Sequence, residues 1–226
     1  MRAKAFAFRT ALLPLMLAAL LPSAATALIT VGALDTPGWA DGIEVVDGLA
    51  YVADGHAGLR VIDVSDPSNP VEVGALDTGN ARGVAVADGL AYVADGASGL
   101  RVIDISHPTS PVEIGALDTA GDARDVEVVG SLAYVADSSS SSRWGSLRII
   151  DISNPTAPAE IGAVGGGMSL VREVEVEGSL AYVVDPRSGL RIIDIDGDRW
   201  NVPGPVYVRY RDLPSILFAF AKFVEE

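Results

Sequence analysis

The chain has 226 residues, of which 30 are acidic and 16 are basic, so its net charge is −14. Such a charge disfavours binding to nucleic acid or to an anionic membrane surface, because both repel a strongly negative protein. The absence of cysteine excludes disulfide scaffolds, cysteine nucleophiles and cysteine-ligated metals, and two histidines are too few for a multi-histidine zinc site.

The first 27 residues have the three parts of a secretory signal. Basic residues precede an apolar run, Ala11 to Leu21, that is too short to span a bilayer. The small-residue pattern Ala25-Thr26-Ala27 then predicts cleavage after Ala27, which would change the net charge to −17. The mature chain is therefore expected to be extracytoplasmic, whether periplasmic, cell-surface or secreted. An uncleaved N-terminal anchor is the alternative.

Beyond this segment, one set of motifs recurs four times, which indicates a repeat architecture. Gly-Leu-Ala-Tyr-Val-Ala-Asp or a close variant places tyrosines at Tyr51, Tyr92, Tyr134 and Tyr182, with spacings of 41, 42 and 48 residues. A Leu-Arg-Val-Ile-Asp motif or variant follows each time. A third motif, Val-Gly-Ala-Leu-Asp-Thr or a variant, starts at Val31, Val73, Ile114 and Ile161.

The second repeat shows what each repeat is expected to form. Its apolar runs are too short for typical helices and are rich in strand-forming residues. They cover Gly83–Ala87, Leu90–Ala94, Leu100–Ile105 and Val112–Leu117. Asp88-Gly89 predicts a type I′ hairpin, and the prolines near residues 106–111 mark a loop. We therefore expect a four-stranded antiparallel meander, with strands A, B, C and D in chain order.

Several of these strands are apolar on both faces, for example Leu190–Ile195. A sheet with one wet face would alternate apolar and polar residues, so each sheet is expected to lie between two others. This pattern predicts an all-β fold over residues 28–198, a β-propeller of four four-stranded antiparallel blades. Residues 28–36 match strand D alone and could complete the last blade, which would close the ring and remove exposed edges. An open arc and a part of a larger ring are the alternatives.

Residues 58–70 read Gly-Leu-Arg-Val-Ile-Asp-Val-Ser-Asp-Pro-Ser-Asn-Pro. This motif resembles the LVIVD repeat family, and the resemblance covers nearly all of residues 28–195. It implies a bacterial or archaeal surface or secreted protein with a β-propeller fold. Because that family is defined by its repeat, the resemblance implies no catalytic residue. The sequence departs from the repeat after Asp194.

Polar residues that recur in every repeat are expected to serve the architecture. The aspartates that end the B strands are predicted to bond nearby backbone N–H groups in turns; these are Asp54, Asp95, Asp137 and Asp185. Asp63, Asp104 and Asp151 end C strands and are predicted to organise the C–D loops, while Asp194 ends the fourth. The strand C arginines are expected to pair with carboxylates between blades; these are Arg60, Arg101, Arg148 and Arg191.

A binding site needs asymmetry, and the repeats differ most in their D–A and B–C loops, which share one face of an antiparallel meander. Three arginines and one aspartate occupy matching places at the start of strand A, and two tryptophans and a further arginine lie in the longer loops. The candidate ligand-binding residues are Trp39, Asp41, Arg82, Arg124, Arg143, Trp144 and Arg172. The planar guanidinium of arginine suits a carboxylate or phosphate, and the tryptophan ring offers a stacking surface, so the set suits an anionic or carbohydrate-like ligand. Alternatively, the arginines balance Glu44, Glu127 and Glu175.

No recurrent His-Asp-Ser arrangement is present, so the sequence favours a non-enzymatic binding or interaction module without a cofactor. Its partner would be a protein, a glycan or a small anionic ligand. The alternatives are a propeller hydrolase or lyase, with or without a divalent cation, and a purely structural surface protein. Calcium at Asp194–Asp198 is a further alternative, although the downstream glutamate of an EF-hand is missing.

Residues 199–226 are expected to form a separate extension of different composition. Pro205–Tyr210 could add a strand, and Leu213–Val224 has the apolar spacing of a short helix. About 12 residues of helix cannot cross a bilayer, so no transmembrane segment is expected in the mature chain.

Overall fold

The computed structural model describes residues 29–138, 145–165, 168, 170–195 and 206–207. Within these residues every regular element is a β-strand. The strands are β1 (Gly42–Val46), β2 (Leu49–Ala53), β3 (Leu59–Asp63), β4 (Val71–Leu76), β5 (Gly83–Ala87), β6 (Leu90–Ala94), β7 (Leu100–Asp104), β8 (Val112–Leu117), β9 (Asp122–Val129), β10 (Leu132–Ser138), β11 (Ser146–Asp151), β12 (Ala159–Val164), β13 (Glu173–Glu177), β14 (Leu180–Asp185), β15 (Gly189–Asp194) and β16 (Val206–Tyr207).

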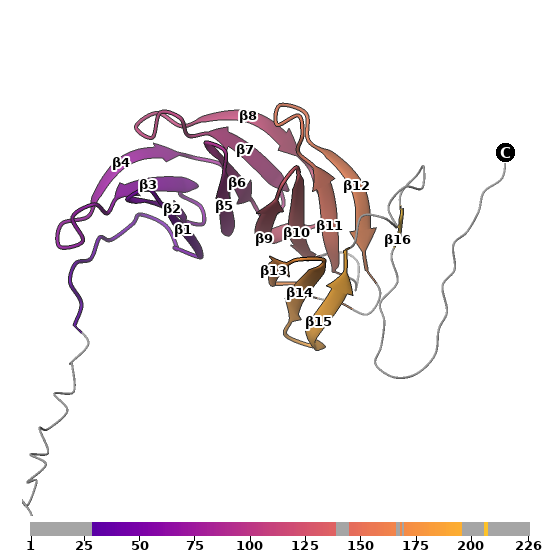
Figure 1. Cartoon of the computed structure of the whole chain (residues 1–226). Coiled ribbons are helices and arrows are strands. Elements are labelled where there is room, and N and C mark those ends of the chain that lie inside the picture. Colours follow the sequence, from indigo (N-terminus) through magenta and orange to yellow (C-terminus); the bar gives the residue numbers. More distant parts are fainter. Residues whose placement is uncertain (1–28, 139–144, 166–167, 169, 196–205, 208–226) are drawn as a thin grey trace, which may run out of the picture. The chain divides into compact units, whose positions relative to one another are not determined.

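These strands form four consecutive sheets (Figure 1). The first sheet is β1–β4, the second β5–β8, the third β9–β12 with β16 added at its edge, and the fourth β13–β15. Within each sheet, strands that follow one another in the chain pair antiparallel, and only β16 pairs parallel among the described strands, with Val206 opposite Gly162. The predicted all-β fold of four antiparallel meanders is thereby confirmed.

The strand positions of the second repeat agree closely with the sequence. Three strands have the predicted bounds, and β7 ends one residue earlier than expected. The hairpin residues Asp88 and Gly89 have φ values of 51° and 76°, and both positive values are what a type I′ turn requires. Asp47 and Gly48 repeat this turn in the first sheet, with φ values of 51° and 79°.

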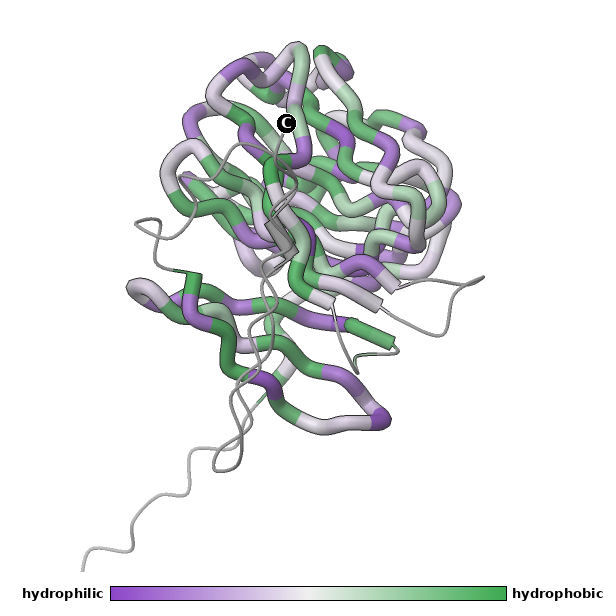
Figure 2. Tube along the Cα trace, turned by 90° about the vertical axis from the view of Figure 1, so that its right-hand side faces the viewer, coloured by the Kyte–Doolittle hydropathy of each residue, from purple (hydrophilic) through white to green (hydrophobic). Residues whose placement is uncertain are grey.

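Consecutive sheets cover one another through buried apolar faces. Between the first two sheets, Tyr51, Leu59 and Val61 pack against Val93 and Ile103, and each is at most 4% exposed. Figure 2 shows hydrophobic stretches running through the body of the trace, with hydrophilic positions between them. The expectation that sheets shield each other on two sides is therefore confirmed for the second and third sheets. No described helix is long and apolar enough to cross a membrane.

The loops meet as the meander predicts. Gly55 of the first B–C loop bridges to Ala81 of the following D–A loop, and Gly96 bridges to Ala123 in the next repeat. The B–C and D–A loops therefore share one face.

The N-terminal segment departs from the sequence expectation. Residues 29–41 form no strand, and the described strands of the fourth sheet pair only with one another. The prediction that residues 28–36 complete the last blade as a strand is therefore wrong for the described part of the chain. The segment lies on the first sheet instead, because its Thr36 hydroxyl donates a 2.6 Å hydrogen bond to Asp54. The predicted signal peptide, most of the third B–C loop insertion and the predicted C-terminal helix lie outside the described residues.

Candidate functional site

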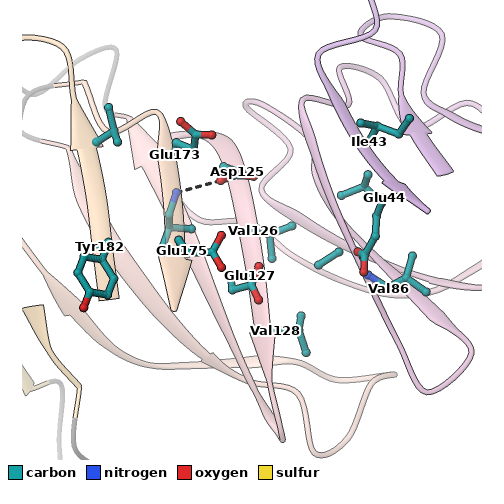
Figure 3. Close-up of a pocket in the computed structure, with 14 residues that line it drawn as sticks. Ile43, Glu44, Val86, Asp125, Val126, Glu127, Val128, Glu173, Glu175 and Tyr182 are labelled. Atoms are coloured by element: carbon teal, nitrogen blue, oxygen red, sulfur yellow. Dashed lines mark hydrogen bonds between the residues drawn. The ribbon is translucent and has the colours of Figure 1, made fainter. Parts of the chain in front are cut away.

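The inner A strands of all four sheets line one pocket. β1 contacts β5, β5 contacts β9, and β9 contacts β13. The pocket between them has a volume of about 360 Å³ and 14 lining residues, contributed by these strands and by β14 (Figure 3). The architecture alone therefore creates a cavity to which every repeat contributes.

The repeat places acidic side chains at matching positions of this pocket. Opposite the strand B tyrosines stand Glu44, Glu127 and Glu175, and the second sheet has alanine there. Side chains two positions apart in a strand point the same way, so Asp125 and Glu173 add two carboxylates beside them. Among the described residues, the lining thus contains five carboxylates and no lysine or arginine.

Two of these carboxylates join neighbouring A strands. Asp125 of β9 accepts a 2.9 Å hydrogen bond from the backbone N–H of Val174 in β13, drawn as the dashed line in Figure 3. Glu44 of β1 accepts a bond from the backbone N–H of Val86 in β5. Glu127 and Glu175 lie next to one another (Figure 3). Glu44 and Asp125 therefore help to hold the inner strands together as well as facing the pocket.

Burial and crowding raise the pKa of these acids. The pKa of Glu127 rises to about 7, mainly through burial and then through repulsion from Glu175, Glu44 and Asp125. Burial also raises the pKa of Asp125 to about 6, although two backbone hydrogen bonds oppose the change. The pKa of Glu44 is raised by burial and lowered in part by the bond from Val86. At least two acids of the pocket thus exchange protons near neutral pH.

The carboxylates are spread around the pocket. No group of three or more histidine, aspartate or glutamate side chains among the described residues could hold a single metal ion. The calcium site considered at Asp194–Asp198 lies largely outside those residues. The pocket can therefore attract a distributed positive charge or transfer protons, and it offers no compact set of metal ligands.

The structure brings several of the sequence-predicted binding residues together beside this pocket. Arg82 lies 3.7 Å from Asp41 and 3.6 Å from Asp122, and Arg124 pairs with Asp122 at 2.7 Å. The arginines therefore balance aspartates at the loop face. The alternative that they balance Glu44, Glu127 and Glu175 is wrong for Arg82 and Arg124.

The remaining predicted binding residues are more dispersed. Trp39 is 76% exposed, and its ring stands edge-on to that of His56 with 5.8 Å between centroids. Arg172 is exposed immediately before β13. Arg143 and Trp144 lie outside the described residues. A ligand role for this set stays a prediction.

The recurrent aspartates of the B strands act over a longer range than expected. Asp54 accepts hydrogen bonds from Thr36 and Gly38, and Asp95 accepts them from Thr78 and Asn80, all in the preceding D–A connection. The predicted bonding to backbone N–H groups is therefore found for both, through Gly38 and Asn80, but these groups lie 16 and 15 residues earlier in the chain and not in the same turn. Bonding within the turn is confirmed for Asp185, whose side chain accepts hydrogen bonds from the backbone N–H groups of Arg187 and Ser188.

The strand C residues stabilise their own sheet. Asp63, Asp104 and Asp151 each accept a 2.9 Å bond from the backbone N–H of the serine two residues later, which confirms their role in the C–D loops. Arg60 pairs with Glu72 and Arg148 with Glu160, in both cases on the adjacent strand of the same sheet. The expectation of pairing between blades is wrong for Arg60, Arg101 and Arg148, each of which pairs with the glutamate of its own strand D.

Sequence reasoning found part of the pocket and misjudged its role. The recurrence of Glu44, Glu127 and Glu175 is visible in the sequence, where charge balance with the arginines explains it without a pocket. Asp125 and Glu173 were missed, although they occupy one matching position of the repeat, two residues before the recurring glutamate. That alignment was the available signal.

The repeat also identifies the family. A model of the LVIVD repeat matches the chain four times in succession, over residues 37–78, 78–119, 120–165 and 169–198. The chain belongs to the LVIVD repeat family. Each of the first three LVIVD matches contains one complete four-stranded meander, and the last contains β13–β15. No curated protein matches the sequence.

Solved structures resemble this LVIVD repeat protein in fold. The computationally designed Ika4 protein has a TM-score of 0.58 at 9% identity, covering 75% of this chain and 99% of its own. Hydrazine synthase of Kuenenia stuttgartiensis has a TM-score of 0.54 at 19% identity, and the WD40 β-propeller domain of Doa1 has 0.54 at 9%. These two matches cover 75% and 72% of this chain, but only 50% and 53% of theirs. At such identities the likeness shows a propeller-like fold alone.

Proposed function

We propose that this LVIVD repeat protein is an exported, non-enzymatic binding module whose ligand is a small organic cation. The observation that carries the proposal is the inner pocket, where five carboxylates face a cavity and none of the described lining residues is basic. A positive group entering it gains the attraction of several partly desolvated acids, which is stronger than attraction in bulk water. The chain's net charge of −14 adds a long-range pull in the same direction.

The chemistry of the pocket favours this ligand over the others. An anion would be repelled by the same acids, and the arginines of the loop face already contact Asp41 and Asp122. A cavity of about 360 Å³ is within the range that holds small molecules. The spread of the carboxylates suits a ligand with separated amino groups, such as a polyamine, better than one metal ion.

Export rests on the N-terminal sequence, with its basic start, short apolar run and Ala25-Thr26-Ala27 pattern. In expressing cells, the chain recovered outside the cytoplasm should begin at Leu28 by intact mass. Recovery with residues 1–27 still attached would contradict cleavage at this position.

Binding can be tested by titrating spermidine into the purified protein in a calorimeter at pH 8 and low salt. We expect saturable binding that a Glu127→Gln/Glu175→Gln double variant weakens by at least about tenfold. Binding should also weaken at pH 5.5, because Glu127 and Asp125 then take up protons, given their pKa values of about 7 and about 6.

Glu177→Gln is the matched control, since this exposed residue ends β13 outside the pocket and its loss should leave the affinity unchanged. Absence of spermidine binding at pH 8, or equal affinity in the double variant, would show that the pocket is not a cation site. Binding of glucuronate that is lost in Arg82→Ala would support the anionic ligand predicted from the sequence instead.

A further inference from the structure

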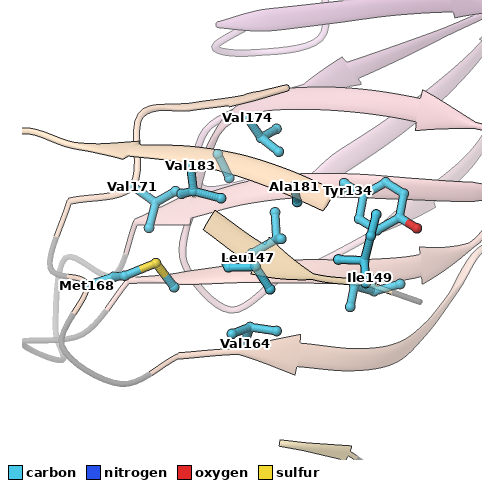
Figure 4. Close-up of a cluster of buried hydrophobic side chains, with 12 residues drawn as sticks. Tyr134, Leu147, Ile149, Val164, Met168, Val171, Val174, Ala181 and Val183 are labelled. Carbon is cyan, nitrogen blue, oxygen red and sulfur yellow. The ribbon is translucent and has the colours of Figure 1, made fainter. Parts of the chain in front are cut away.

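Three interfaces between consecutive sheets use equivalent residues. In each, one sheet presents a tyrosine and an alanine of strand B and a leucine and a valine or isoleucine of strand C, which we call its projecting face. The next sheet presents an alanine and a valine of strand B and an isoleucine of strand C, which we call its receiving face. The third interface shows the pattern, with Tyr134, Leu147 and Ile149 packed against Ala181 and Val183 (Figure 4).

The projecting face of the fourth sheet is open to solvent. Val184, Leu190 and Ile192 are 39%, 61% and 48% exposed. Their counterparts in the other three sheets are at most 2% exposed; these are Ala53, Leu59, Val61, Ala94, Leu100, Val102, Ala136, Leu147 and Ile149. The fourth sheet therefore carries the same apolar face as the others, but no neighbouring sheet covers it among the residues that the structure describes.

The receiving face of the first sheet lines an apolar groove of about 430 Å³. It is lined by Ala50, Val52 and Ile62, which are 3%, 5% and 6% exposed, and by four residues of the N-terminal segment, Gly32, Ala33, Leu34 and Thr36. The equivalent space over the second sheet is filled by Tyr51, Leu59 and Val61 of the first. The groove thus lacks a projecting face of the kind that the fourth sheet leaves exposed.

The N-terminal segment already has the position that strand D takes at the internal interfaces. The ideal Cβ position of Gly32 falls on the carbonyl oxygen of Pro67, as that of Gly74 falls on the carbonyl oxygen of Pro108. The Thr36 hydroxyl bonds to Asp54 at 2.6 Å, as Thr78 bonds to Asp95 at 2.7 Å. The N-terminal segment is therefore positioned as strand D of a further sheet that would pack on the receiving face of the first.

The chain's own fourth sheet does not occupy this groove, because Leu190 and Ile192 stay exposed. The three internal interfaces repeat the same contacts, and joining four sheets through them leaves the projecting face of the fourth sheet exposed. Next to the receiving face of the first sheet, Ile43 and Val45 of β1 are 65% and 58% exposed. We propose that a second copy of this chain supplies the missing contacts. The fourth sheet of each chain packs into the groove of the other, and two chains close one ring of eight sheets.

The oligomeric state tests this pairing directly. Light scattering after gel filtration should give twice the mass of one chain for the purified protein. Because Leu190 and Ile192 are exposed in the single chain, a Leu190→Glu/Ile192→Glu variant should keep its β-sheet circular dichroism and elute at the mass of one chain. Val112→Glu is the control, because Val112 is 54% exposed on β8 and belongs to neither face; this variant should keep the double mass.

Crosslinking distinguishes two chains from closure within one chain. Leu59 pairs with Leu76 across strands C and D, and the repeat makes Leu190 and Leu34 their counterparts. The chain has no cysteine of its own, so a Leu34→Cys/Leu190→Cys variant can be oxidised selectively. We expect covalent dimers on a non-reducing gel.

Three results would overturn the proposal. One is a crosslink confined to one chain, which would mean that the ring closes on itself. The second is a single-chain mass for the unsubstituted protein at concentrations up to hundreds of micromolar. The third is an unchanged double mass in the Leu190→Glu/Ile192→Glu variant.

Discussion

Glu127 shows how the position of a residue in the repeat sets its chemistry. The same glutamate placed at an exposed turn would ionise near 4.5, but burial beside Glu175, Glu44 and Asp125 raises its pKa to about 7. A carboxyl whose pKa is raised by folding favours the folded state when it is protonated. That contribution is fully present below pH 4.5 and is lost as the pH rises through 7.

Replacing Glu127 by glutamine should remove this loss. At pH 8 we expect the Glu127→Gln variant to be more stable than the unsubstituted protein by about 1 kcal/mol, a value that allows for solvent screening of a half-buried group. At pH 4 the two should unfold at the same urea concentration. Urea titrations at both values measure the difference, with Glu177→Gln as a control that should behave like the parent protein at each pH. A variant less stable than the parent at pH 8 would mean that Glu127 makes a net favourable contact.

At the scale of the element, strand D of the first and of the second sheet depends on a glycine that nothing larger can replace. A Cβ added to Gly74 would lie 2.0 Å from the carbonyl oxygen of Pro108, and one added to Gly115 would lie 2.1 Å from that of Pro155. Both prolines are in the C–D loop of the next sheet. The backbone of one sheet therefore touches the loop of its neighbour at this point, and only a hydrogen atom fits between them.

Gly115→Ala should thus destabilise the protein by about 3 kcal/mol, because a rigid backbone has to move to make room. Gly130→Ala is a suitable comparison, since Gly130 has a φ of 60° but an open space where the Cβ would go. Backbone strain alone should cost about 1 kcal/mol there. Chemical denaturation of both variants measures the difference, and equal losses would show that the close approach to Pro155 is relieved at no cost.

The elements were largely predictable from the sequence, and the site was predictable only in part. Short apolar runs separated by Asp-Gly turns specify strands such as β5 and β6 through local chemistry that recurs in each repeat. The partners of Asp54 and Arg82 could not be inferred in this way. Thr36 and Gly38 reach Asp54 from the preceding connection, and Asp122 reaches Arg82 from the next sheet, so both contacts depend on how whole sheets stack.

The N-terminal segment shows the same limit. Its sequence matches strand D, and it takes the place of strand D against the first sheet. It nevertheless forms no strand, because a strand requires a hydrogen-bonding partner that its sequence does not contain.

At the scale of the whole molecule, residues at equivalent positions of the repeats contribute different amounts to the free energy of unfolding. Leu100 is fully buried between the second and third sheets, whereas its counterpart Leu190 is 61% exposed. In a repeat protein each unit is stabilised mainly by its nearest neighbours, so the unit at an open end has fewer favourable contacts.

Alanine substitutions should show this difference. We expect Leu100→Ala to cost about 3 to 4 kcal/mol of unfolding free energy through the cavity that it leaves. Leu190→Ala should cost less than about 1 kcal/mol when measured at dilutions where the protein is a single chain. Thermal and urea unfolding of the two variants under identical conditions check the prediction. Similar costs would mean that Leu190 is covered within one chain.

The contact between the strand D glycine and the next proline loop also bears on how such a gene changes in length. Each contact joins one sheet to its immediate successor and to no other, as Gly74 with Pro108 and Gly115 with Pro155 show. Duplication of one whole repeat therefore adds complete contacts, deletion removes complete contacts, and the other contacts stay intact in both cases. Recombination between the near-identical repeat segments can change the copy number without disturbing the packing of those that remain.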